Sequence, residues 1–351
     1  MRVLIVKLTS MGDLVQALPA LTDARRAIPE IEFDWVVDEA FAEIPRWHPA
    51  VRQTLETAHR RWRGQHALPW RNRELRQFRA RLRSNRYDIV IDAQNNYKSA
   101  LVTALSRGEK HGPDSRSVRE WGAHLAYDQR YDIPRKQLAI DRWRQLFARV
   151  LGYELPASAP DFGLGCKTWP QPACTLPATP YLVFVQNASW PNKRWHDQHW
   201  RALLELAGDQ GYHVLLPWGS AAEQAQAQGL AAGFDRALVL PRLSLSELAG
   251  IFSRASGAVC VDTGLAHLSA ALDVPTVTLY GATDPRLIGA TGARAAHLAV
   301  QGFDCAPCYK RLCKVDAYRG PDARCMRALP VERVWRELGI LMAGRPTDLL
   351  N

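Results

Sequence analysis

The chain has 351 residues and a mass of 39.4 kDa, which suits two domains of ordinary size. Hydrophobic residues make up 47% of the chain and charged residues 23%, which excludes a disordered protein. The formal net charge of +10 and the pI near 9.4 favour an anionic partner. The longest apolar runs, such as 181–185, are far shorter than the roughly 18–20 residues of a membrane-spanning helix, so we expect none.

The first residues, MRVLIVKLTSMGD, predict a β-strand followed by its loop. Their apolar run is too short for the hydrophobic region of a secretory signal, and no cleavage site follows it. We therefore expect a cytoplasmic protein. In that reducing compartment the seven cysteines are expected to be thiols or metal ligands rather than disulfides.

Short β-rich runs alternate with helix-like stretches through the first half of the chain. The expected strands are 2–6, 33–37 and 87–93, and the expected helices are 13–27, 39–46, 97–106 and 138–151. This alternation indicates a parallel sheet with helices on both faces. A Pro-rich stretch with little periodicity, 156–180, is typical of a linker.

The alternation restarts after the linker. Strands are expected from about 181, 213, 237, 257 and 276, and helices from about 197, 221, 245 and 264. We therefore expect an α/β protein with two Rossmann-like, doubly wound parallel-sheet domains facing a central cleft. The expected boundaries are 1–160 for the N-terminal domain, 161–180 for the linker, 181–330 for the C-terminal domain and 331–351 for a C-terminal helix that packs back on the N-terminal domain.

An arginine-rich segment, Arg60–Arg86, carries most of the excess positive charge. Ten arginines in it face one acidic residue, Glu74, and Trp62 and Trp70 lie among them. This pattern favours a surface that binds carboxylates, phosphates or lipid headgroups. A solvated helix is the alternative. Nucleic acid is a less favoured partner, because no recognised nucleic-acid-binding motif accompanies the segment.

Three loops that follow predicted strands contain candidate functional residues. The first, KLTSMGDL, holds Asp13, which could also be only a helix cap, and it lacks both GxGxxG and GxxxxGK[ST]. The second, QNASWPNKRW, holds Lys193 and can bind phosphate, although an ordinary turn would look similar. The third, VCVDTGLAHLSAAL, places a tight turn and a helix N-terminus where a diphosphate could bind, with capping and core roles as the alternative.

Many ordered segments together resemble the lipopolysaccharide heptosyltransferases, which are inverting GT-B glycosyltransferases. They are MRVLIVKLTSMGDLVQALPAL, FDWVVDEAFAEIPRWHPAV, RRWR, YDIVIDAQ, KHG, LPWGSAAE, VDTGLAHLSAALDVPTVTLYG and TDPRLIG. The resemblance spans most of residues 1–290. It implies transfer of L-glycero-D-manno-heptose from ADP-heptose to a Kdo sugar of Kdo-lipid A, and RRWR and FDWVV favour the member that adds the first heptose.

The resemblance also implies roles for individual residues. The family's base corresponds to Asp13, its phosphate-side lysine to Lys193 and its ribose-binding glutamate to Glu223. Ala188 and Ser189 stand where two threonines often contact the diphosphate, so Ser189 is expected to contact the donor. The donor loop corresponds to Asp262, Thr263, Gly264 and His267.

The acceptor and the membrane are the expected anionic partners. We expect Arg60, Arg61 and Arg63 to bind the Kdo carboxylates and lipid A phosphates at the cytoplasmic face of the inner membrane. No cofactor is expected, and the absence of a DxD triplet agrees with metal-independent transfer. Nucleic acid is not an expected partner.

Four cysteines near the C-terminus are spaced as C-x2-C-x4-C-x11-C. They are Cys305, Cys308, Cys313 and Cys325. A structural zinc ion, reduced thiols and disulfides are the open alternatives, because this spacing is not that of a common zinc module. Similar segments occur in transferases that add the second heptose.

Three other functions remain alternatives. The first is transfer of the second heptose. The second is a nucleotide-sugar epimerase of the same fold, which would need no lipid acceptor. The third, a basic nucleic-acid-binding protein, would explain the charge but not the VDTGLAH loop.

Overall fold

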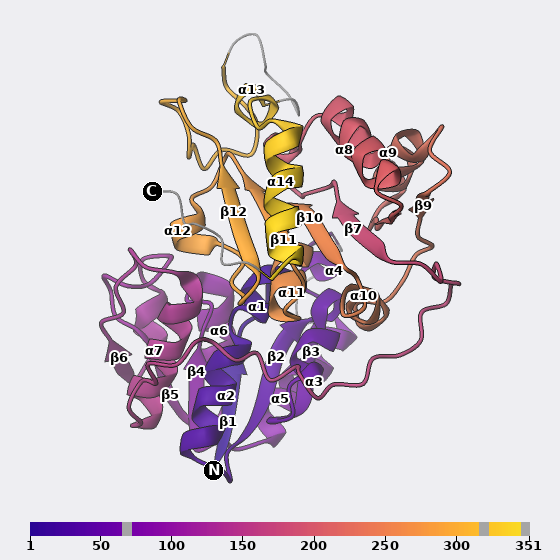
Figure 1. Ribbon diagram of the computed structural model, residues 1–351. Coiled ribbons are helices and arrows are strands. Elements are labelled where there is room, and N and C mark those ends of the chain that lie inside the picture. Colours follow the sequence, from indigo (N-terminus) through magenta and orange to yellow (C-terminus); the bar gives the residue numbers. More distant parts are fainter. Residues whose placement is uncertain (65–71, 316–322, 345–351) are drawn as a thin grey trace. The chain divides into compact units, whose positions relative to one another are not determined.

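The computed structural model describes residues 1–64, 72–315 and 323–344 and leaves the side chains of Arg60 and Arg63 undescribed. The chain divides into two compact units, Met1–Lys167 and Thr168–Asn351. Within the described residues, each unit contains one six-stranded sheet whose strand pairs are all parallel (Figure 1). The predicted fold class is confirmed.

The N-terminal sheet has the strand order β3-β2-β1-β4-β5-β6. Its strands are β1 (Arg2–Val6), β2 (Glu32–Asp38), β3 (Val51–Thr57), β4 (Ile89–Asp92), β5 (Glu109–Pro113) and β6 (Gln129–Tyr131). The helices of this unit are α1 (Met11–Val15), α2 (Leu18–Ala27), α3 (Glu43–Trp47), α4 (His59–Gly64), α5 (Arg73–Ser84), α6 (Tyr97–Leu105) and α7 (Ala139–Leu151). Residues 3–6 of β1 are buried, as a parallel strand between two helical layers requires.

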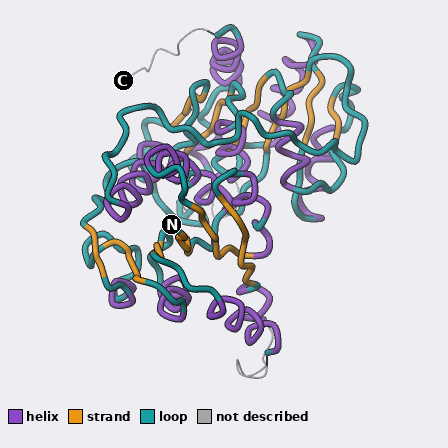
Figure 2. Tube along the Cα trace, turned by 90° about the horizontal axis from the view of Figure 1, so that it is seen from below, coloured by secondary structure: helices purple, strands orange, loops and turns teal. Residues whose placement is uncertain are grey.

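The C-terminal sheet has the order β12-β11-β10-β7-β8-β9. Its strands are β7 (Tyr181–Val185), β8 (His213–Leu216), β9 (Ala237–Val239), β10 (Gly257–Val261), β11 (Thr276–Tyr280) and β12 (Ala295–Ala299). Its helices are α8 (Asp197–Asp209), α9 (Ala221–Ala231), α10 (Leu245–Phe252), α11 (Gly264–Ala271), α12 (Pro285–Ile288), α13 (Arg324–Arg327) and α14 (Val331–Met342). Figure 2 shows helices beside the strands in both units.

Both sheets contain a topological switch point, where the strand order reverses. In the N-terminal sheet it lies between β1 and β4, and in the C-terminal sheet between β10 and β7. Ligands of open α/β sheets bind beyond the carboxyl ends of the strands at such points. The loops after these four strands are therefore the places to look for functional side chains.

The sequence analysis did not expect strands β3, β5, β6 and β12, and three further details differ from it. The expected helix 13–27 is two helices, α1 and α2, with Pro19 in the first turn of the second. Phe162 and Leu164, at the start of the expected linker, are buried in the N-terminal unit. Helix α14 packs against α8, β10, β11 and β12, so the described part of 331–351 belongs to the C-terminal unit rather than to the N-terminal domain (Figure 1).

One buried ion pair ties α7 to α2 in the N-terminal unit. Arg144 Nε lies 2.6 Å from Asp23 Oδ2, and its guanidinium also donates to the carbonyl oxygens of Pro156 and Ser158. The ion pair and these hydrogen bonds thus offset the cost of burying the two charges. Among the described residues, no helix has the length and apolarity to cross a membrane.

Candidate active site

Asp13 lies in α1, the short helix that follows β1 and its loop. Its Oδ2 accepts hydrogen bonds from Ser10 N at 3.0 Å and from Ser10 Oγ at 2.8 Å. The Asp13 side chain is half-buried. The capping role considered in the sequence analysis is therefore real, and the same contacts hold the carboxylate at the switch point of the sheet.

Lys7 directly follows β1 and is almost completely buried, with 2% of its surface exposed. Its Nζ donates to the carbonyl oxygen of Ala93 at 3.0 Å and lies 3.8 Å from the ring centroid of Trp143. Burial lowers the pKa of Lys7 from 10.5 to about 8, whereas the negative charge of Asp13 raises it. A buried ammonium thus lies near enough to Asp13 to feel its charge.

The lowered pKa of Lys7 predicts a pH-dependent stability difference between the protein and its Lys7→Met variant. Below pH 8 the folded and unfolded chains both hold the proton, so the cost of the buried charge is fully present. Between pH 8 and 10.5 only the unfolded chain holds it, so the stability of the wild type rises with pH. We expect a gain of up to about 3 kcal/mol relative to the variant. Urea denaturation on both sides of this window measures it, and a difference that is independent of pH contradicts it.

The loop after β4 supports the loop after β1. Gln94 Oε1 accepts hydrogen bonds from Leu8 N at 2.5 Å and from Thr9 N at 3.0 Å. Asp92, at the end of β4, accepts a 2.8 Å hydrogen bond from the hydroxyl of Tyr127. Burial raises the pKa of Asp92, and hydrogen bonds from Asn95 N, Gln94 N and the Tyr127 hydroxyl oppose that rise. The switch point of the N-terminal sheet is therefore rigidly hydrogen-bonded.

In the C-terminal unit, two candidate donor-binding residues form an ion pair. Lys193 follows β7 and Asp262 follows β10, and Lys193 Nζ lies 2.6 Å from Asp262 Oδ2. Their side chains are only 14% and 5% exposed. The hydroxyl of Thr283 also donates to Asp262 Oδ2, and the Lys193 ammonium lies 4.8 Å from the ring centroid of Trp190. Because an ammonium has three donors, Lys193 retains donors for an anionic ligand.

The remaining residues of the donor loop begin helix α11. Thr263 is its N-cap residue, and Gly264 begins the helix, so the free N–H groups of this turn can bind an anion. His267 lies one turn further on and is 7% exposed. The structure thus places Asp262, Thr263, Gly264 and His267 along one strand-to-helix connection at the carboxyl end of β10.

Two other predicted donor residues make local contacts. Glu223 Oε2 accepts hydrogen bonds from Gly219 N and Ser220 N, so it forms a capping box at the start of α9. Ser189 is exposed, and its carbonyl oxygen accepts a hydrogen bond from Arg311. Contacts of either side chain with a donor remain a prediction.

Asn187 is a candidate that the sequence analysis did not single out. It follows β7 and is 7% exposed, and neither its Oδ1 nor its Nδ2 has a hydrogen-bond partner among the described residues. Buried amides are normally hydrogen-bonded, so this side chain is suited to a polar ligand at the switch point. The signal in the sequence was an amide in the QNASWPNKRW loop, and its burial could not be deduced.

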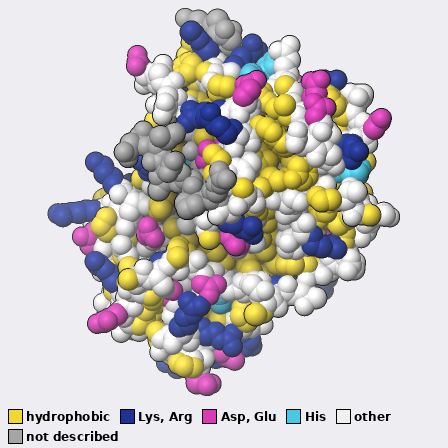
Figure 3. Space-filling model, viewed as in Figure 1, with side chains coloured by type: hydrophobic (Ala, Val, Ile, Leu, Met, Phe, Trp, Pro, Cys, Tyr) yellow, Lys and Arg dark blue, Asp and Glu magenta, His cyan; other side chains and the backbone are white. Residues whose placement is uncertain are grey.

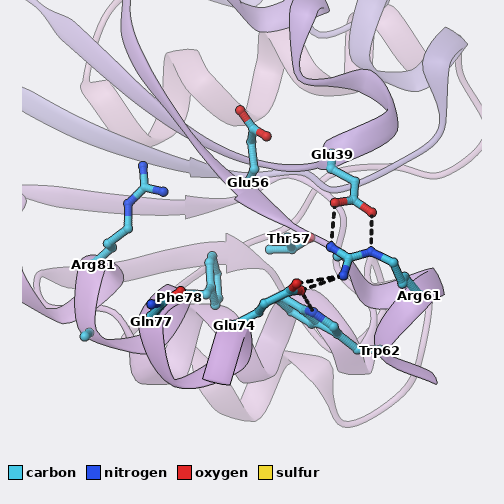
Figure 4. A pocket seen from close by; sticks show the side chains of 11 residues that line it. Glu39, Glu56, Thr57, Arg61, Trp62, Glu74, Gln77, Phe78 and Arg81 are labelled. Carbon is cyan, nitrogen blue, oxygen red and sulfur yellow. Dashed lines mark hydrogen bonds and ion pairs between the residues drawn. The ribbon is translucent and has the colours of Figure 1, made fainter. Parts of the chain in front are cut away.

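The arginine-rich segment lines a cavity of about 500 Å³ in the N-terminal unit (Figure 4). Arg61 lies between Glu39 and Glu74, with Nη2–Oε2 and Nη1–Oε2 distances of 3.0 and 2.8 Å, and Trp62 Nε1 donates to Glu74. These contacts raise the pKa of Arg61, the hydrogen bond with Glu39 most of all. Arg61 is thus already paired within the fold. Arg60 and Arg63 belong to α4, but their side chains lie outside the described residues.

The four cysteines are free thiols. Burial raises the pKa of Cys325 to about 11, and the charges of Cys305, Cys308 and Cys313 act in the same direction. Within 1–64, 72–315 and 323–344, no group of three or more His, Cys, Asp or Glu side chains is arranged to hold a metal ion. Zinc binding by these cysteines stays one of the open alternatives.

This chain is similar in sequence and fold to known proteins. A sequence model of glycosyltransferase family 9 (heptosyltransferase) matches residues 75–319. Lipopolysaccharide heptosyltransferase 1 of Pseudomonas aeruginosa is 49% identical over 89% of this chain and 87% of its own length. A lipooligosaccharide heptosyltransferase 2, from Haemophilus ducreyi, is 25% identical over 81% of this chain and 84% of its own length.

Solved structures of the Escherichia coli heptosyltransferase WaaC are also similar. The structure with ADP has a TM-score of 0.83 and 39% identity, covering 97% of this chain and all of that chain. The structure with ADP-2-deoxy-2-fluoro heptose has a TM-score of 0.77 and 42% identity, covering 86% of this chain and 94% of that chain. These likenesses agree with the parallel sheets and the loops described above. The chain belongs to glycosyltransferase family 9, the heptosyltransferases.

Proposed function

We propose that this heptosyltransferase moves L-glycero-D-manno-heptose from ADP-heptose to a Kdo sugar of Kdo-lipid A, with inversion at the anomeric carbon. The Lys193–Asp262 pair at the switch point of the C-terminal sheet is the observation that carries the proposal. It offers a buried, oriented cation to a diphosphate. The likeness to WaaC structures that contain ADP and a fluorinated ADP-heptose supports the identity of the donor.

The C-terminal unit is assigned the donor. Negative charge grows on the diphosphate as ADP leaves, and Lys193 can stabilise that charge with its remaining N–H donors. The free N–H groups at the start of α11, at Thr263 and Gly264, can act in the same way. In this proposal Asp262 orients the ammonium, His267 and Ser189 contact the donor, and Glu223 binds the ribose.

The N-terminal unit is assigned the base. A sugar hydroxyl is weakly acidic, so a carboxylate within hydrogen-bond reach must take its proton during attack on the anomeric carbon. We assign this role to Asp13, whose carboxylate Ser10 holds at the carboxyl edge of the sheet. Direct displacement from the face opposite the ADP leaving group inverts the anomeric centre.

Arg61 provides a test of acceptor binding by the arginine-rich segment. Arg61→Gln is expected to raise the KM for the acceptor about tenfold, because it removes a cation and frees two carboxylates that repel an anionic acceptor. The affinity for ADP should not change. Arg79→Gln is the matched control, since Arg79 is an exposed arginine of α5 that does not line the cavity. Equal effects of both changes on the acceptor KM would contradict a specific role for Arg61.

We further propose that the protein works as a peripheral protein on the cytoplasmic face of the inner membrane. Its acceptor is a lipid, and the net charge of +10 favours an anionic lipid surface. On the face shown in Figure 3, basic and acidic side chains are interspersed. The proposal therefore rests on the net charge and the arginine-rich segment rather than on a single basic face. Binding to anionic vesicles that weakens with salt would support it, and equal binding to neutral vesicles would contradict it.

The choice of acceptor distinguishes addition of the first heptose from addition of the second. ADP release should be measured with ADP-heptose and either Kdo-lipid A or a core that already carries one heptose. Turnover with Kdo-lipid A alone is the expected result, in line with the 49% identity to a heptosyltransferase 1 and the 25% identity to a heptosyltransferase 2. Turnover with the heptosylated core alone would assign the protein to the second position.

A further inference from the structure

An exposed apolar surface lies on α6 and on the short 3-10 helix η2 (Ala123–Ala126) that packs against it. Tyr97 and Leu101 are one turn apart on α6, Trp121 precedes η2, and Leu125 belongs to η2. Their exposed fractions run from 61% to 75%, which makes them the four most exposed large hydrophobic side chains of the described residues. We call Tyr97, Leu101, Trp121 and Leu125 the apolar patch.

The fold holds the two parts of the patch together. Tyr97 N donates a hydrogen bond to Glu120 Oε2 at 2.8 Å, which ties the start of α6 to the residue before Trp121. A Cβ atom on Gly122 would lie 3.7 Å from the Tyr97 ring, so the backbone after Trp121 lies against that ring. A buried cluster joins α6 and the η2 segment from below and consists of Ala100, Val118, Ala123 and Tyr127. The patch is therefore one fixed surface.

The composition of the patch favours the surface of a lipid bilayer. A single exposed hydrophobic side chain needs no explanation, but several gathered on one surface mark an interaction site. Trp and Tyr are enriched where lipid headgroups meet acyl chains, because each has an apolar ring and one polar N–H or O–H group. Leu101 and Leu125 add purely apolar area beside the rings of Tyr97 and Trp121.

Three exposed basic side chains border the patch. Lys98 lies in the first turn of α6, and Arg119 lies in the loop before Trp121. The guanidinium of Arg130 lies beside η2, because its Nε donates to the carbonyl oxygen of His124 at 3.0 Å. We call Lys98, Arg119 and Arg130 the basic rim. Cations around an inserting apolar surface attract anionic lipid headgroups.

The basic rim argues against a second copy of this chain as the occupant. Two copies joined patch to patch would bring two basic rims together, and their like charges would repel. An anionic bilayer instead offers negative headgroups to the rim and an apolar layer to the patch.

We propose that the apolar patch and the basic rim dock this protein on an anionic phospholipid bilayer, with the four patch side chains inserted between headgroups and acyl chains. The inference rests on the proposed function, because the lipid acceptor is what requires the protein to work at a membrane. It assigns the patch to the phospholipid of the bilayer and not to the sugars of the acceptor.

The test measures binding to phospholipid vesicles that contain no acceptor. Wild type, Leu101→Gln/Leu125→Gln and Trp121→Gln are sedimented with vesicles of phosphatidylethanolamine and phosphatidylglycerol, and with vesicles of phosphatidylcholine. The double variant should bind the anionic vesicles about tenfold to hundredfold more weakly than the wild type, because it loses apolar area that the bilayer would bury. Trp121→Gln should lose about threefold to tenfold, and it carries the test if the double variant does not fold.

Leu155→Gln/Leu238→Gln is the matched control. Both leucines are exposed but lie outside the patch, one after α7 and one in β9. This variant should bind the vesicles within about twofold of the wild type. Lys98→Gln/Arg130→Gln tests the basic rim and should weaken binding to the anionic vesicles about tenfold, with little change for phosphatidylcholine.

Three results would overturn the inference. They are absence of wild-type binding to the anionic vesicles, equal binding by the patch variants and the control, and a wild-type dimer that the patch substitutions dissociate. The last result, seen by sedimentation velocity, would identify a second copy as the occupant. The proposed function is tested separately, because absence of ADP release with ADP-heptose and Kdo-lipid A would overturn it whatever the vesicles show.

Discussion

Asp13→Asn is expected to lower kcat about a hundredfold to ten-thousandfold while leaving the affinity for ADP intact. Asparagine keeps an oxygen that can accept the hydrogen bonds from Ser10, so α1 should persist. It cannot take a proton from the acceptor hydroxyl at neutral pH. Initial rates of ADP release and an ADP titration measure the two quantities separately.

Asp114→Asn is the matched control for this change. Asp114 also accepts backbone hydrogen bonds within a loop of the N-terminal unit, from Arg116 N and Ser117 N. It has no part in the proposed reaction, so kcat should stay within about twofold of the wild type. If Asp13→Asn kept at least a tenth of the wild-type kcat, Asp13 would not be the base.

Lys193→Met is the second change with a large expected effect. It removes the cation assigned to the diphosphate, so kcat/KM should fall about a hundredfold to a thousandfold. It also leaves the carboxylate of Asp262 buried without its partner, which should cost about 3–5 kcal/mol in the free energy of unfolding. Activity assays and urea denaturation of the same protein report both losses.

A double variant separates the two roles of Lys193. In Lys193→Met/Asp262→Asn the buried position is neutral, and the Thr283 hydroxyl can still donate to the new amide oxygen. Most of the stability should therefore return while the activity stays low. Recovery of activity together with stability would contradict the assignment of Lys193 to the leaving diphosphate.

Eight of the twelve strands that the structure describes and most helices could be predicted from the sequence, because buried β-rich runs such as 181–185 and 257–261 alternate with longer amphipathic stretches. Strands β3, β5, β6 and β12 were missed. The break between α1 and α2 was missed, since apolar residues continue through Ala17 and Leu18. Phe162 and Leu164 were expected to lie in a linker, because the sequence around them has little periodicity. Their burial was missed, since it depends on packing within the N-terminal unit.

The candidate site was only partly accessible to sequence reasoning. The donor loop was predictable because its residues are consecutive and follow a buried strand. The pairing of Lys193 with Asp262 was not, because the parallel sheet brings together loops far apart in the chain. Likewise, Glu74 is the only acid within the arginine-rich segment, but the fold adds Glu39 beside Arg61, so this arginine is paired with two carboxylates, which the sequence does not suggest.

The surroundings of Lys7 illustrate the same limit. Lys7 lies more than a hundred residues before Arg119 and Arg142, whose charges act on it in the folded chain. Only the position of Lys7, at the end of an apolar strand, gave a local signal. Burial against Trp143 and the unpaired Nε of Arg142 are properties of the assembled sheet edge.

Analysis of the reaction product tests the central proposal most directly. Purified protein should be incubated with ADP-heptose and Kdo-lipid A, and the product examined by mass spectrometry and by NMR of the new glycosidic linkage. The account predicts an acceptor heavier by one heptose, with the anomeric configuration inverted relative to the donor. Release of ADP without transfer of heptose to the acceptor, or a product with retained configuration, would contradict it.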